Sequence, residues 1–166
     1  MPVPTTPHNT TTPIPISLRP ATWDDSEFVY QVKKAALGEY VAQTWGWDED
    51  FQRDYHKKDF APSDFQVILF AGKGVGVISI KHRADHVSLG EFYILPEYQR
   101  RGIGTFLIRQ VIEDAQGRQL PVRLQFLKVN PVRRLYERMG FSIVGENEHY
   151  YQMERKAVLT QRKEMA

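Results

Sequence analysis

The chain has 166 residues, of which 42% are hydrophobic and 25% charged, a balance typical of one soluble globular domain. The absence of cysteine excludes disulfides, thiolate metal sites and cysteine nucleophiles, and it fits a reducing cytoplasm. No apolar run approaches the ~20 residues of a membrane span, and the N-terminus lacks the pattern of a secretory signal. A formal charge of +2 argues against a nucleic-acid binder. We therefore expect a cytoplasmic protein with no membrane or nucleic-acid partner.

The composition changes at about residue 15. Residues 1–15 contain five prolines and five threonines, so few side chains there can bury apolar area, and we expect a flexible N-terminal arm. A regular hydrophobic pattern then continues to about residue 155. We expect one domain over residues 16–155, followed by a tail at residues 156–166.

The first half of the domain begins with a short strand, Ile16–Ala21. Thr22 is a typical N-cap, with Asp24 and Asp25 in the first turn of a helix that we expect to end around Gly38. A second helix is predicted over Glu49–Lys58. Strands at residues 66–71 and 75–81 are joined by Gly72-Lys73-Gly74, a typical hairpin signal.

The second half begins with a strand at residues 87–95. Strict alternation there would turn Val87, Leu89, Glu91, Tyr93 and Leu95 to one side, and Ser88, Gly90, Phe92 and Ile94 to the other. A helix at 102–116, a strand at 122–127, a helix opening with Pro131 and ending at Met139, and strands at 141–144 and 150–154 complete the domain. This order predicts an α/β (α+β) fold with a mixed sheet and helices on both faces.

The turn before the helix at 102–116 could hold a phosphate group. The first N–H groups of a helix and its dipole attract anions, and Gly102 and Gly104 let the backbone approach closely. Arg100 and Arg101 add positive charge beside it. The alternative is an ordinary glycine turn with two solvated arginines. A dinucleotide fingerprint is excluded because Leu107 stands where the third glycine is needed.

Two segments resemble those of the GNAT acetyltransferase superfamily. Residues 98–104, Tyr-Gln-Arg-Arg-Gly-Ile-Gly, resemble its (Gln/Arg)-x-x-Gly-x-(Gly/Ala) signature, and residues 130–141 resemble its Asn…Leu-Tyr-Glu-x-x-Gly-Phe segment. The resemblance extends over residues 16–154. It implies one mostly antiparallel sheet of about seven strands, and acetyl-CoA as co-substrate without a metal.

The resemblance also implies where acetyl-CoA binds. Backbone N–H groups of residues 100–105 would hold the pyrophosphate, and the pantetheine arm would pair like a strand beside Ile94 and Leu95. Asn130 would orient the arm, and Arg133 is a further candidate for phosphate binding. The full set of cofactor-binding candidates is Ile94, Leu95, Gln99, Arg100, Arg101, Gly102, Ile103, Gly104, Thr105, Asn130, Arg133 and Tyr136.

Two residues are candidates for catalysis. Tyr136 stands at the family's acid position and would protonate the leaving thiolate, with packing under the sheet as the alternative. Glu91, on the strand expected to line the cleft, is the candidate base, and a structural ion pair is its alternative. Some relatives that acetylate protein N-termini carry a glutamate where Gln125 stands, so that mechanism is in doubt here. His149 is a reserve base.

The segment at residues 39–49, expected as a loop between the first two helices, contains two tryptophans. In the GNAT fold such a loop borders the acceptor, so Tyr40, Trp45 and Trp47 are substrate-binding candidates, together with Tyr93 and His149. Aromatic faces suit a cationic amine, although a tryptophan could equally anchor the loop.

The sequence thus predicts an N-acetyltransferase acting on a primary amine of a small molecule or peptide. The alternatives are a non-catalytic acyl-CoA-binding module and a nucleic-acid-associated protein using the arginines at 100–101 and 133–134. The acceptor, the length of the acyl chain and the formation of a homodimer stay open.

Overall fold

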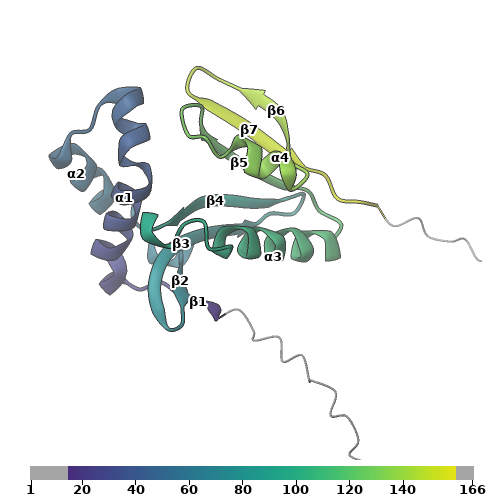
Figure 1. Ribbon diagram of the computed structural model, residues 1–166, viewed down its shortest axis with the longest axis horizontal. Coiled ribbons are helices and arrows are strands. Elements are labelled where there is room, and N and C mark those ends of the chain that lie inside the picture. Colours follow the sequence, from purple (N-terminus) through teal and green to yellow (C-terminus); the bar gives the residue numbers. More distant parts are fainter. Residues whose placement is uncertain (1–14, 160–166) are drawn as a thin grey trace, which may run out of the picture.

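The computed structural model describes residues 15–159, which form one seven-stranded sheet with four α-helices (Figure 1). The expected arm, apart from Pro15, and the last seven residues of the expected tail lie outside this range. The strands are β1 (Ile16–Pro20), β2 (Gln66–Phe70), β3 (Lys73–His82), β4 (Val87–Ile94), β5 (Val122–Leu127), β6 (Ser142–Glu146) and β7 (Tyr150–Arg155). The helices are α1 (Ser26–Trp45), α2 (Glu49–Asp59), α3 (Ile103–Gly117) and α4 (Arg133–Arg138).

The strand order in the sheet is β1-β2-β3-β4-β5-β7-β6. All neighbouring strands pair antiparallel except β4 and β5, which pair parallel. The expected mixed, mostly antiparallel sheet of about seven strands is therefore confirmed. Short turns join β2 to β3, β3 to β4 and β6 to β7, whereas the parallel pair of β4 and β5 needs a long crossover, which α3 supplies.

Helices cover both faces of the sheet, as expected (Figure 1). On one face, α3 buries a stripe of helical spacing, which packs with α4 against the strands; the stripe is Ile103, Leu107, Ile108, Val111 and Ala115. On the other face, Val29 and Val32 of α1 pack with Phe60 against Val67 and Val77 of β2 and β3. Two cores therefore lie on opposite faces of the sheet. Each fully buried aliphatic side chain contributes about 1.5–3 kcal/mol to this packing.

Helix α1 is longer than the sequence indicated. It continues through Gly38 to Trp45, so the predicted end at Gly38 is wrong, and most of the expected loop at 39–49 is helical. Gly38 needs no positive φ, and a Cβ there would meet only ordinary contacts, so this glycine does not terminate the helix. The helix ends at Gly46, whose φ of +82° suits glycine.

Other boundaries differ by a few residues. Helix α4 begins at Arg133, after Pro131, and Gly140 follows it with a φ of +92°. The β2–β3 turn is Ala71-Gly72, both at positive φ, so Lys73 and Gly74 belong to β3. No helix in residues 15–159 is long and apolar enough to cross a membrane.

A buried carboxylate fixes the entry into α1. Asp25 accepts hydrogen bonds from both terminal nitrogens of Arg19, at 2.8 and 2.7 Å, and from the Thr22 N–H at 2.8 Å. The Arg19 hydrogen bonds lower the pKa of Asp25 to about 2. Thr22 therefore caps a short 3-10 helix, Trp23–Asp25, which leads into α1.

Because the folded-state pKa of Asp25 lies below its ordinary value, this ion pair stabilises the fold at neutral pH, and the contribution is lost as pH falls from about 4 to about 2. Arg19 is partly exposed, so we expect Asp25→Asn to lower the free energy of unfolding by about 1–2 kcal/mol at pH 7 and by much less at pH 2. Urea unfolding at both pH values measures this. The exposed neighbour Asp24→Asn is the control, and an equal effect of Asp25→Asn at both pH values would contradict the assignment.

Candidate active site

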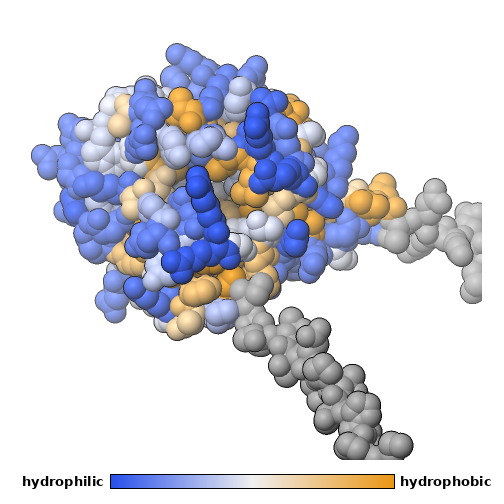
Figure 2. Space-filling model, in the orientation of Figure 1, coloured by the Kyte–Doolittle hydropathy of each residue, from blue (hydrophilic) through white to orange (hydrophobic). Residues whose placement is uncertain are grey.

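The site begins where β4 and β5 separate. These parallel strands pair only at Val87 with Val122 and at Ser88 with Arg123, near their N-terminal ends. Beyond these pairs, β4 stays on β3 and β5 stays on β7, so the sheet opens into a gap between its two halves. Figure 2 shows hydrophobic surface in a hollow at the middle of one face, between hydrophilic side chains.

An irregularity in β4 changes which way its side chains face. Ile80 pairs with Leu89 but Ile78 pairs with Phe92, so β4 holds one extra residue there, as in a β-bulge. Val87, Leu89, Phe92 and Ile94 consequently all pack on the α3 side. The predicted strict alternation is therefore wrong, because the bulge reverses it.

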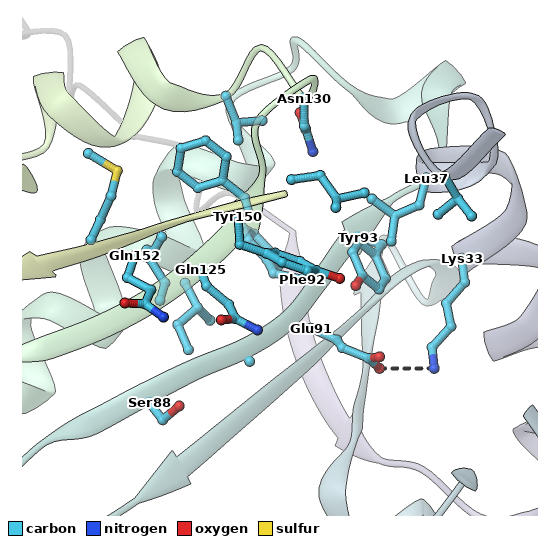
Figure 3. Close-up of a pocket in the computed structure, with 18 of the residues that line it drawn as sticks. Lys33, Leu37, Ser88, Glu91, Phe92, Tyr93, Gln125, Asn130, Tyr150 and Gln152 are labelled. Atoms are coloured by element: carbon cyan, nitrogen blue, oxygen red, sulfur yellow. Dashed lines mark ion pairs between the residues drawn. The ribbon is translucent and has the colours of Figure 1, made fainter. Parts of the chain in front are cut away.

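The bulge determines where Glu91 lies. Its carboxylate Oε2 is 3.0 Å from Nζ of Lys33 on α1, on the opposite face from Leu89 (Figure 3). Tyr93 packs against the α1-side core as well. The extra residue thus turns one carboxylate and one phenol away from the α3 core and toward the face that α1 covers.

A cavity of about 1140 Å³ occupies this gap and extends under α1 and α2. Of the residues proposed from sequence, it brings together Trp45, Trp47, Glu91, Tyr93, Asn130 and Tyr136. Gln125 and Gln152 also line it, from β5 and β7, in the same cavity as the ion pair of Glu91 and Lys33 (Figure 3). The cavity is therefore apolar and aromatic with a few polar groups, the character of a small-molecule site.

The glycine turn lies beyond the end of β4, outside the cavity lining. Arg100 and Gly102 adopt left-handed conformations, with φ of +62° and +82°, and Gly102 is the N-cap of α3. No side chain caps α3, and a Cβ at Gly102 would meet open space, so the backbone there is accessible. Successive N–H groups in such a turn form a concave anion site at the positive end of the helix.

The turn is fastened to β4. Gln99 Nε2 donates a hydrogen bond of 2.9 Å to the Ile94 carbonyl. The Leu95 N–H donates to the Val75 carbonyl on the β3 side, so by strand alternation the Ile94 N–H faces the gap. This arrangement places the glycine turn and a backbone donor of β4 together at the mouth of the gap.

The guanidinium of Arg101 lies 5.2 Å from the centre of the Tyr98 ring. The Lys73 ammonium lies 5.6 Å from the centre of the same ring. Arg133 forms an ion pair with Glu137 and lies over the Tyr151 ring, so its charge is already engaged. Arg100 and Arg101 are exposed and belong to the turn itself.

Tyr136, on α4, also lines the cavity. Only 8% exposed, it packs against Phe126 and Phe141, with ring centres 5.8 and 5.6 Å away. Burial raises its pKa to about 12. The pKa of Tyr93 is raised well above its ordinary value, chiefly by burial and then by Glu91, with smaller contributions from Tyr150 and Tyr136. Both groups are therefore neutral phenols at physiological pH, and Tyr93 lies near enough to the Glu91 carboxylate for its pKa to be raised by it.

The tryptophans differ in role. Trp45 is 53% exposed at the end of α1, and its ring lies 5.0 Å from His149 and 6.1 Å from Tyr150 in the β6–β7 hairpin. Trp47 donates from Nε1 to Glu49 at 2.8 Å, which anchors it. His149 thus contacts the cavity through Trp45, and Tyr40 does not line it.

Sequence reasoning missed one wall of the cavity. Helix α1 contributes a stripe at helical spacing, namely Tyr30, Lys33, Leu37, Val41 and Trp45. The signal was present in the sequence, but the predicted end at Gly38 divided it. Helix α2 adds Phe51, Gln52, Tyr55 and His56. No cluster of three potential metal ligands occurs within residues 15–159.

A family model described as the acetyltransferase (GNAT) family matches residues 26–141, which include both the glycine turn and Tyr136. The chain belongs to the GNAT acetyltransferase family. Proteins of this family use acetyl-CoA. The resemblance seen in the two sequence motifs is thereby confirmed.

Human and mouse cysteine-rich protein 2-binding proteins are each 29% identical over 100 residues, covering 55% of this chain and 12% of those proteins. The chain thus spans a small part of the curated relatives it matches. PaiA N-acetyltransferase of Thermoplasma acidophilum, solved with coenzyme A, has a TM-score of 0.68 at 18% identity, covering 85% of this chain and 98% of that chain. The ribosomal-protein-S18-alanine N-acetyltransferase of Escherichia coli has a TM-score of 0.62 at 16% identity, covering 88% and 97%. These structural likenesses show the GNAT fold.

The turn geometry predicts that Gly102→Glu lowers CoA affinity by at least about 100-fold, because it adds left-handed strain of about 1–2 kcal/mol and puts a negative charge at the anion site. Isothermal titration with CoA measures the change. Gly72→Glu is a matched control, since Gly72 has the same φ of +82° and open space around it. Equal CoA affinity in wild type and Gly102→Glu would refute the assignment of the turn.

Proposed function

We propose that this GNAT protein transfers an acetyl group from acetyl-CoA to a primary amine of a small molecule or peptide. The observation that carries this proposal is the gap between β4 and β5. It joins the anion-binding turn at the end of β4 to a cavity whose walls bear Tyr136 and Glu91. A donor entering from the turn and an acceptor entering beneath α1 would meet there.

The residues around the turn fit the donor. Uncapped N–H groups at the start of α3, with Gly102 beneath and exposed Arg100 and Arg101 beside them, suit a pyrophosphate. The Ile94 N–H is directed at the gap, where it would bind the pantetheine arm or the carbonyl oxygen. Bound acetyl-CoA supplies an acetyl group attached to a sulfur leaving group.

Tyr136 is suited to supply the proton that the departing sulfur needs. With a pKa of about 12, its phenol stays protonated throughout the neutral range. The same burial disfavours an ionised thiolate beside it, so a proton or hydrogen bond from this phenol stabilises the leaving group.

Glu91 is suited to take the proton from the attacking amine. Its carboxylate lines the cavity, with Oε2 3.0 Å from the Lys33 ammonium, and a carboxylate there can accept a proton from an amine bound in the cavity. The same contact also fits a purely structural ion pair, so the test must separate the two roles. Gln125 cannot act as a base, so we propose Glu91 as the acceptor of this proton, with His149 as the reserve candidate.

Aromatic side chains would bind the acceptor on the α1 side. Trp45, Trp47 and Tyr93 line this part of the cavity, and aromatic faces attract a cationic amine before it loses its proton. His149 would act through Trp45, which it contacts. A screen of acetyl-CoA turnover against polyamines, amino acids and peptides identifies the acceptor. CoA binding without any acetyl transfer would favour a non-catalytic acyl-CoA-binding module.

If Tyr136 is the acid, Tyr136→Phe lowers kcat by about 100-fold or more, because general acid catalysis contributes about 10²–10⁴ to the rate. CoA affinity should change little, since only the hydroxyl is removed. Steady-state kinetics and CoA titration separate the two effects. Tyr151→Phe is the control, because Tyr151 also contacts Phe126 but does not line the cavity. Wild-type turnover in Tyr136→Phe would remove its acid role.

If Glu91 is the base, Glu91→Gln lowers kcat/KM by about 100-fold at neutral pH and abolishes the acidic limb of the pH–rate profile. Glu154→Gln is the matched control, since Glu154 also lines the cavity and pairs with Arg123 at 2.8 Å. An unchanged acidic limb together with a lower Tm would assign Glu91 to a structural ion pair instead.

A further inference from the structure

Helix α2 places two exposed aromatic rings at the cavity, and neither has a part in the proposed chemistry. Phe51, Gln52, Tyr55 and His56 all line the cavity, so one face of α2 is turned toward it. His56 is buried, whereas Phe51 and Tyr55 are 63% and 56% exposed. The rings of Phe51 and Tyr55 are stacked, with centres 6.4 Å apart. Their exposed faces are therefore accessible to a ligand in the cavity.

Two further rings extend this aromatic surface. Trp45, at the end of α1, is 53% exposed, and its ring centre lies 6.1 Å from that of Tyr150 on β7. Burial, and then nearby Tyr55, raises the pKa of Tyr150, so Tyr55 lies close to the same phenol. Trp45, Phe51, Tyr55 and Tyr150 all line the cavity, and we call these four residues the aromatic rim.

No lysine or arginine among residues 15–159 lies over a ring of the aromatic rim. The cation–π contacts in this part of the chain involve other rings, those of Tyr30, Phe65, Tyr98 and Tyr151. An aromatic face carries negative electrostatic potential, and it attracts a cation within about 6 Å of the ring centre. The aromatic rim therefore keeps this attraction for a cation that a ligand brings.

Two carboxylates add negative charge beside the aromatic rim. Asp48 and Asp54 stand three residues before and after Phe51, and residues three apart are neighbours on a helix surface. The Asp48 carboxylate also accepts a hydrogen bond of 2.9 Å from the Phe51 N–H. Within the described residues the ion pairs of α2 involve Glu49 and Arg53 instead, so Asp48 and Asp54 keep their negative charges. This surface therefore favours a cation over a neutral group.

Basic side chains of the cavity are already engaged. Lys33 and Arg123 line it, and they pair with Glu91 and Glu154 at 3.0 and 2.8 Å. The two lysines in the last turn of α2 do not line the cavity. The positive charges of the described residues therefore leave the aromatic rim to a cation from outside the protein.

We propose that the aromatic rim binds a second cationic group of the acceptor, a protonated or quaternary ammonium, at a distance from the amine that receives acetyl. This inference rests on the proposed acetyltransferase function and narrows its acceptor class to amines with a second, cationic nitrogen. The cavity, at about 1140 Å³, is lined by both Glu91 and the aromatic rim, so one molecule can extend from the candidate base to the rim.

Choline and 3,3-dimethylbutan-1-ol test the aromatic rim without acetyl transfer, because they share one shape and only choline is a cation. Titration into the protein, with and without CoA and followed by ligand NMR, should show choline binding about 10-fold or more tighter. Phe51→Leu and Tyr55→Leu should each lower this preference by about 3-fold or more, whereas Tyr55→Phe, which keeps the ring, should retain it. Trp23→Leu is the matched control, since Trp23 is 70% exposed but does not line the cavity.

The role toward the acceptor is tested with ω-aminoalkyl trimethylammonium ions and their neutral tert-butyl analogues. Long chains keep the pKa of the reacting amine equal in the two series, because the charges are then far apart. At the chain length that fits the cavity, wild type should prefer the cationic acceptor by about 10-fold in kcat/KM. Phe51→Leu and Tyr55→Leu should bring this preference toward one, and Trp23→Leu should retain it.

Equal binding of choline and 3,3-dimethylbutan-1-ol, or a preference that survives both leucine variants, overturns the aromatic rim as a cation site. Equal kcat/KM for the two acceptor series at every chain length overturns its role toward the acceptor. CoA affinity and acetyl transfer to peptides are measured on the same samples, and their retention confines the failure to the aromatic rim. Loss of all acetyl transfer in wild type, with the choline preference intact, instead rejects the proposed function.

Discussion

The parallel contact between β4 and β5 is the constraint on which the site depends. Only two residue pairs join these strands, so the two halves of the sheet stay connected at one end and separate at the other. Each half retains its own antiparallel pairing, which satisfies the backbone on the closed sides. At the opening, one edge of β4 is therefore free to pair with a ligand. The other edge of β4 stays hydrogen-bonded to β3, and β5 stays hydrogen-bonded to β7.

The bulge in β4 connects this opening to the chemistry. One extra residue lets Leu89 and Phe92 both pack against α3, and it turns Glu91 toward Lys33 on α1. The same strand then ends at Ile94, to whose carbonyl Gln99 fastens the glycine turn. Strand β4 thus carries core residues, the candidate base Glu91 and the attachment of the glycine turn. A shift in the register of β4 would displace all of these.

The α1–α2 wall of the cavity is built differently from the glycine turn outside it. The turn, proposed to bind the donor, exposes backbone N–H groups and two arginines to solvent, which would suit a phosphate group. The α1–α2 wall instead combines paired charges with buried neutral groups, Tyr30 and His56.

The sequence by itself determined the order of the elements, the two family motifs and the glycine turn, because these depend on local backbone preferences and on residues close together in the chain. It did not determine the length of α1, since a glycine within a helix and a glycine that ends one differ only in φ, as Gly38 and Gly46 illustrate. It also missed the bulge, because strand alternation contains no signal for an inserted residue. Only the tertiary structure brought Lys33 to Glu91 and His56 to Tyr30, since these pairs join helices and strands whose relative packing is decided by burial across the whole domain.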